Sequence, residues 1–66
     1  MPKRYKVREM IRIVETDGWY RVHAKGGHRQ FKHDTKRGRV TISGKGSDTL
    51  HPKTAASILS QAQITP

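Results

Sequence analysis

The sequence contains no cysteine, which excludes disulfides, thiolate zinc sites and cysteine nucleophiles. Acidic residues are scarce: five Asp and Glu stand against fourteen Lys and Arg, and no paired carboxylates indicate carboxylate catalysis. No window approaches the ~20 apolar residues that a membrane-spanning helix needs. The charged first ten residues lack an apolar run, so we expect no signal peptide, no membrane association and a soluble, cytoplasmic protein.

Few apolar side chains are available for a core, because only 32% of the 66 residues are hydrophobic. A chain this short buries only ~60% of the surface that its unfolded form exposes, so we expect residues 1–66 to form one small domain. Positive charge is in excess, with a formal net charge of +9. Such an excess indicates a polyanionic partner, nucleic acid before an anionic membrane or an acidic protein. A basic solvated surface without function would have the same composition.

Two segments have the apolar spacing of amphipathic helices. The shared spacing i, i+3, i+4 and i+7 places apolar side chains on one face, and it occurs at Val7, Met10, Ile11 and Val14 and again at Ala55, Ile58, Leu59 and Ala62. The first predicted helix covers residues 6–17 and ends at Asp17-Gly18, because glycine is favoured just past a helix C-terminus. The second starts at Pro52, since proline suits the first helical turn.

Three segments between these helices are predicted to be strands. Residues 19–24 and 28–33 flank Gly26-Gly27, and a Gly-Gly pair between two strand-like runs is typical of a tight hairpin. Residues 39–43 alternate apolar and polar side chains and form the third strand. The order α-β-β-β-α predicts an α+β fold, a three-stranded antiparallel sheet with two helices on one face. The other face of the sheet is then open to solvent.

The hairpin predicts which side chains share this open face. A two-residue loop pairs Lys25 with His28, Ala24 with Arg29, His23 with Gln30 and Val22 with Phe31. Because Val22 and Phe31 are apolar partners, we expect theirs to be the buried face. The open face then carries Arg21, His23, Lys25, His28, Gln30, Lys32, Arg39, Thr41 and Ser43. A bulge would shift this register by one residue on the first strand.

His28 is the candidate catalytic residue on this face. An imidazole titrates near neutral pH and can move a proton during RNA cleavage. RNA carries its own nucleophile, the 2′-hydroxyl, so a proton-transfer group and cations that stabilise the charged transition state can suffice. Lys25, Lys32 and Arg21 are the expected phosphate ligands, and His23, Gln30 and Arg39 complete the expected RNA-binding set. The alternative is that His28 is an ordinary surface histidine in a basic patch.

Other motifs carry weaker hypotheses. His23, His28, His33 and His51 suggest a metal site, but His28 and His33 fall on opposite faces of one strand, and a metal needs three or four converging ligands. We therefore expect no metal and no cofactor. The glycines of residues 44–47 lack the spacing of a phosphate-binding loop and indicate a flexible loop. Trp19 either stacks on a base or packs, half-buried, at a sheet edge.

The segment DGWYRVHAKGGHRQFKH (17–33) resembles the signature of the HicA toxin family. That signature is a helix ending in D-G-[WF], a strand, then K-G-S-H and an aromatic two or three residues on. The resemblance continues into GRVTIS (38–43) and LHPKTAASILSQAQI (50–64), the latter similar to a closing pattern of leucine, proline, a small turn and an S-I-L-x-Q-A helix. It covers about residues 6–64, and the order and spacing of its pieces are together specific.

This resemblance implies a fold like that of double-stranded-RNA-binding domains and a ribosome-independent endoribonuclease toxin that cuts mRNA. It implies that His28, at the histidine of K-G-S-H, is the essential catalytic residue. It also implies a HicB-type antitoxin that masks this histidine, in a complex that typically represses its own operon. We expect a monomer alone and a hetero-oligomer with the antitoxin.

Two positions depart from the family pattern. Gly27 replaces the usual serine before the histidine, so any help from that hydroxyl is missing, and Gln63 replaces a usual glycine near the end of the last helix. Two other functions remain open. One is a non-catalytic double-stranded-RNA-binding module, because such domains share the fold without cleaving. The other is a toxin-like subunit whose main role is to bind a protein.

Overall fold

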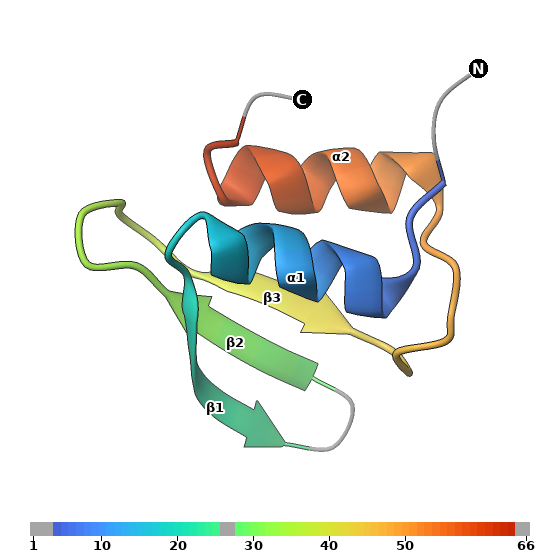
Figure 1. Cartoon of the computed structure of the whole chain (residues 1–66), viewed down its shortest axis with the longest axis horizontal. Coiled ribbons are helices and arrows are strands. Elements are labelled where there is room, and N and C mark those ends of the chain that lie inside the picture. Colours follow the sequence, from blue (N-terminus) through green and yellow to red (C-terminus); the bar gives the residue numbers. More distant parts are fainter. Residues whose placement is uncertain (1–3, 26–27, 65–66) are drawn as a thin grey trace.

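The computed structural model describes residues 4–25 and 28–64, and its element order is the predicted one (Figure 1). The helices and strands are α1 (Val7–Thr16), β1 (Tyr20–Lys25), β2 (His28–Lys32), β3 (Val40–Ser43) and α2 (Pro52–Gln61). The strands form one antiparallel sheet in the order β1-β2-β3. Both helices lie on the same side of this sheet, over β3, and β1 is the edge strand farthest from them. The α+β prediction is confirmed.

The core fills the space between the helices and the sheet. Among the residues whose burial is described, the core side chains come from both helices, from β2 and β3, and from the segments that flank them. They are Val7, Met10, Val14, Trp19, Phe31, Val40, Ile42, Leu50, Ala55, Ile58, Leu59 and Ala62. The predicted helix faces are confirmed, with Ile11 half-buried at the margin of the core. Neither helix has the length and apolar content that a membrane span requires, in the part of the chain that is described.

Hydrogen bonds cap the starts of both helices, a local one at α2 and long-range ones at α1. Pro52 opens α2, and the imidazole Nδ1 of His51 accepts the Lys53 amide N–H at 3.1 Å, as an N-cap side chain does. At the start of α1, the amides of Val7 and Arg8 donate to carbonyls of the loop that follows β3. These carbonyls belong to Asp48 and Gly46, at 2.9 and 3.1 Å.

The same contacts settle the character of the loop at residues 44–48. Its carbonyls face the amides at the start of α1, whereas a phosphate-binding loop presents amides to its ligand. The Asp48 carboxylate also accepts the Lys45 amide N–H at 3.0 Å. The loop is therefore a hydrogen-bonded cap on α1 and does not have the arrangement of a phosphate-binding loop, while its flexibility stays a prediction.

Candidate functional site

The hairpin of β1 and β2 has the predicted register near its turn. Lys25 pairs with His28, Ala24 with Arg29 and His23 with Gln30. The Gly26-Gly27 turn itself lies outside the described residues, as do the side chains of residues 23–25. The backbone register thus places His23 and Lys25 opposite Gln30 and His28, and directly opposite residues share a face of the sheet.

Farther from the turn the register shifts, and the prediction there was wrong. Phe31 pairs with Arg21 instead of Val22, because β1 has an irregularity between Arg21 and His23. One extra residue in a strand turns every residue beyond it to the other face. Arg21 is therefore on the side of Phe31, and its guanidinium carbon lies 5.8 Å from the centre of the Phe31 ring. Arg21 does not lie on the open face.

The same bulge brings Tyr20 to the open face, which the sequence analysis missed. Tyr20 pairs with Lys32, and Lys32 is exposed on the side opposite the buried Phe31. Trp19, one residue earlier, is buried, as the alternation of a strand requires. Bulges depend on how two strands pair, so no local pattern in residues 19–24 indicated this one.

The remaining predicted residues of the open face lie together. His28 pairs with Ser43 and Gln30 with Thr41 across β2 and β3. The guanidinium of Arg39, which directly precedes β3, donates to the Gln30 side-chain oxygen at 2.9 Å. We define the open face by its described members Tyr20, His28, Gln30, Lys32, Arg39, Thr41 and Ser43.

His28 differs from the other two histidines whose side chains are described. His33 and His51 use ring nitrogens in hydrogen bonds to the backbone. His28 is exposed at the first position of β2, and its ring makes no hydrogen bond to any described residue. As far as the described residues are concerned, both of its nitrogens are left for proton exchange with a ligand on the open face.

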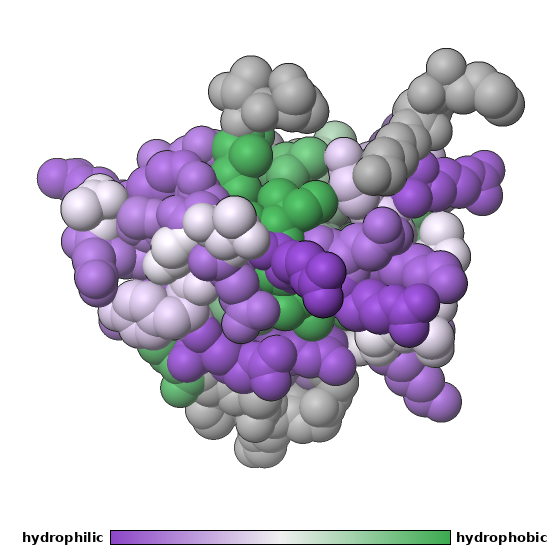
Figure 2. All heavy atoms as spheres, in the orientation of Figure 1, coloured by the Kyte–Doolittle hydropathy of each residue, from purple (hydrophilic) through white to green (hydrophobic). Residues whose placement is uncertain are grey.

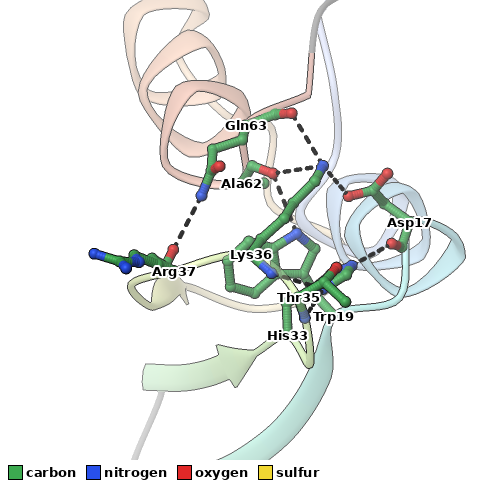
Figure 3. Close-up of polar contacts among 8 residues, drawn as sticks. All are labelled: Asp17, Trp19, His33, Thr35, Lys36, Arg37, Ala62 and Gln63. Carbon is green, nitrogen blue, oxygen red and sulfur yellow. Dashed lines mark hydrogen bonds and ion pairs between the residues drawn. The ribbon is translucent and has the colours of Figure 1, made fainter.

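His33 has a structural role that sequence reasoning missed (Figure 3). Its Nε2 donates to the Asp17 carbonyl at 2.7 Å, while its Nδ1 accepts the amide N–H groups of Thr35 and Lys36 at 3.1 and 3.2 Å. These amides fix the tautomer, since Nδ1 must be the acceptor. The ring also packs edge-on against Trp19, with centroids 5.2 Å apart. His33 therefore ties the end of β2 to the end of α1.

Trp19 and Lys36 extend this junction to α2. Trp19 is only 2% exposed, and its indole N–H donates to the Ala62 carbonyl at 3.2 Å, which rules out the base-stacking hypothesis for this residue. The Lys36 ammonium donates to the Asp17 carboxylate at 2.5 Å and to the carbonyls of Ala62 and Gln63 (Figure 3). That hydrogen bond, more than the charge of Lys36, lowers the pKa of Asp17 below 3.8.

The outer side of α1 carries a second basic region. Arg8, Glu9, Arg12 and Ile13 line a shallow hollow of about 320 Å³ there. Figure 2 shows that the surface on the helix side is mostly hydrophilic, with hydrophobic side chains visible between the two helices. The hollow and the open face lie on opposite sides of the molecule, because α1 packs between them. Among the described residues, no three His, Asp or Glu side chains group as metal ligands would.

Comparison with known proteins gives one family. A family model described as the HicA toxin of bacterial toxin-antitoxin systems matches residues 7–64 of the 66-residue chain. The match begins at the first residue of α1 and ends just after α2, so it includes the whole sheet and His28. The curated proteins gave no match.

Proposed function

The chain belongs to the HicA toxin family of bacterial toxin-antitoxin systems, and from this premise we propose that it is an endoribonuclease that cleaves mRNA on the open face. His28 is the catalytic residue of this proposal. The observation that carries it is the contrast between the exposed, uncommitted ring of His28 and the hydrogen-bonded rings of His33 and His51. A proton-transfer residue must keep a ring nitrogen free for its substrate.

The proposed reaction is a transesterification within the RNA. The ribose 2′-oxygen attacks the adjacent phosphorus while its proton leaves, and the bond from phosphorus to the 5′-oxygen breaks as that oxygen gains a proton. The products are a 2′,3′-cyclic phosphate and a 5′-hydroxyl. His28 carries one of the two proton transfers and water carries the other.

A cation near His28 would stabilise the charge that develops on the phosphate, and the backbone register places Lys25 opposite His28. Lys32 and Arg39 lie farther along the open face, at the other end of β2, where they would bind neighbouring phosphates of the same RNA. Fixed positive groups close to a developing negative charge lower the barrier. Gln30, held by Arg39, and His23, paired with Gln30 by register, complete the proposed RNA-binding set.

A toxin-antitoxin family implies an antitoxin partner for this chain. We propose that the partner is of the HicB type and that it covers the open face, where it would mask His28. The open face bears Lys32 and Arg39, and the whole chain has a formal net charge of +9, so an acidic partner surface is favoured there.

Induced expression in bacteria tests the function. Wild type should arrest growth and deplete full-length mRNA, whereas His28→Ala should do neither although it accumulates as folded protein. His51→Ala is the matched control, because it removes an exposed imidazole on the helix side, and it should remain toxic. Equal arrest by wild type and His28→Ala would assign the toxicity to binding alone. Absence of arrest in all three would favour the non-catalytic RNA-binding module.

A further inference from the structure

An exposed aromatic side chain stands on the open face at a position that the bulge alone creates. Without the irregularity between Arg21 and His23, strand alternation would turn Tyr20 toward the helices. With it, Tyr20 pairs with Lys32 and is 45% exposed. The bulge thus removes a cation, Arg21, from the open face and supplies an aromatic ring in its place.

We propose that Tyr20 stacks on a base of the bound RNA and so sets where the strand lies relative to His28. This inference rests on the proposed function, since it assigns a further RNA-binding residue to the same face. An aromatic ring beside cations that track the phosphates is the arrangement by which proteins hold single-stranded RNA. Among the described residues, Tyr20 is the only phenylalanine, tyrosine or tryptophan on the open face.

The distance between Tyr20 and His28 limits which nucleotide of the RNA can stack on Tyr20. Tyr20 is opposite Lys32, and Lys32 is four residues from His28 along β2, a separation of about 13 Å at ~3.3 Å per residue. A stacked strand rises ~3.4 Å per nucleotide, so the base lies within about four nucleotides of the phosphate at His28. Lys32 lies next to Tyr20, where it can contact a phosphate of the same segment.

The chemistry of this surface favours RNA over an apolar protein partner. Tyr20 has a cationic neighbour in Lys32, and the rest of the described open face is polar or charged. Val22, at the bulge of the same strand, is also a large hydrophobic side chain that is exposed, at 43%. A partner that bound this strand through apolar contact would use Tyr20 and Val22 alike, whereas a stacked base requires only the planar ring.

The experiment measures binding of a single-stranded, 2′-O-methylated RNA, which lacks the nucleophile, to the full chain by fluorescence anisotropy. Tyr20→Ala should weaken binding about tenfold, because stacking on one base is typically worth a factor of that order. Tyr20→Phe should bind as wild type does, Tyr20→Leu should match Tyr20→Ala, and Val22→Ala should have no effect. Thermal unfolding checks that each variant is folded.

An abasic nucleotide moved along the RNA then locates the contact. At one position it should weaken wild-type binding and abolish the difference between wild type and Tyr20→Ala, which a general loss of structure would not do. Equal binding by Tyr20→Ala and wild type, or equal losses for Tyr20→Leu, Tyr20→Phe and Val22→Ala, would overturn the proposal. Cleavage of unmodified RNA by wild type is scored separately, so failure of the ribonuclease function is distinguished from failure of the stacking contact.

Discussion

At the residue scale, a small polar junction connects both helices to the sheet. His33, Lys36 and Trp19 join the end of β2, the end of α1 and the end of α2 through backbone carbonyls of Asp17 and Ala62. Side chains that satisfy helix-end carbonyls replace water at positions where burial would otherwise cost free energy. The junction also positions the sheet, and hence the open face, relative to the helices.

Gly18 tests how closely this junction is packed. Its φ is +104°, and a Cβ at this position would lie 2.7 Å from the His33 Nε2. Gly18→Ala should therefore lower the free energy of unfolding by about 2–3 kcal/mol, from backbone strain together with the displaced imidazole. Urea unfolding measures this. Gly38→Ala is the matched control, since φ is +85° but nothing lies within 4 Å, and it should cost only about 1 kcal/mol. Equal losses would contradict the close packing on His33.

Asp17 gives the junction a dependence on pH. The pKa of Asp17 is lowered in the folded state, first by the hydrogen bond from Lys36. The ionised carboxylate therefore stabilises the fold when the pH is above the pKa that Asp17 has in the unfolded chain. That contribution is lost as the pH falls through the folded pKa. Asp17→Asn should therefore be less stable than wild type at pH 7, and the difference should shrink below pH 3.8. A difference that stays constant with pH would contradict the assignment. Asp34→Asn, at an exposed turn position, should change little at either pH.

Sequence reasoning placed His28 on the open face but missed the structural role of His33, for a physical reason. His28 belongs to a local motif after a Gly-Gly turn, which the sequence displays. The role of His33 depends on contacts with Asp17 and Trp19, and its hydrogen bond to Asp17 spans sixteen residues. Such contacts exist only once the helix and strand have packed.

At the scale of elements, the two helices end with the same backbone motif but with different residues. In α1 the amides of Gly18 and Trp19 donate to the carbonyls of Glu15 and Val14. In α2 the amides of Gln63 and Ile64 donate to Ser60 and Leu59 in the same pattern. This motif requires a left-handed residue just after the C-cap, where glycine is favoured. Gln63 adopts that conformation with φ of 56°.

Gln63→Gly should therefore stabilise the protein. Glycine avoids the cost of about 1 kcal/mol that a side chain incurs in the left-handed region. The substitution also removes the exposed hydrogen bond that the side-chain amide of Gln63 donates to the Arg37 carbonyl. The expected net gain is about 0.5 kcal/mol, or roughly 3 °C in Tm for a chain of this size. Thermal unfolding measures it, with Gln63→Ala as the control that loses the hydrogen bond and keeps the strain. A Tm for Gln63→Gly below that of Gln63→Ala would refute this interpretation.

The helices and strands could be predicted from the sequence because each has a local signal. Apolar spacing indicated α1 and α2, Pro52 marked a helix start, and Gly18 marked a helix end. The bulge in β1 had no such signal, since it arises where Arg21, and not Val22, pairs with Phe31. A shift of one residue in the pairing of β1 with β2 thus changed which side chains belong to the candidate site, although the predicted fold was correct.

At the scale of the whole molecule, charge alone does not locate the proposed RNA-binding site. Basic side chains occur both on the open face, at Lys32 and Arg39, and on the outer side of α1, at Arg8 and Arg12. Only the open face also presents an uncommitted histidine in the described part of the chain. We therefore predict that RNA phosphates contact the basic residues of the open face and not those on the outer side of α1.

Salt dependence distinguishes the two regions. For single-stranded RNA, each phosphate contact adds about 0.7 to the slope of the logarithm of the binding constant against the logarithm of salt concentration. Lys32→Gln should reduce this slope by about 0.7. Arg8→Gln removes the same charge from the opposite side and should leave the slope unchanged. If Arg8→Gln reduced the slope and Lys32→Gln did not, RNA would bind on the outer side of α1 instead.

Cleavage of RNA by the purified chain, in EDTA and without ribosomes, tests the assignment of the open face as a metal-independent active site most directly. Wild type should cut single-stranded mRNA and leave 2′,3′-cyclic phosphate and 5′-hydroxyl ends. His28→Ala should bind the same RNA with similar affinity and cut at least about a hundredfold more slowly, the usual scale of a lost proton-transfer group. Equal cleavage by wild type and His28→Ala, or cleavage that EDTA abolishes, would contradict this mechanism.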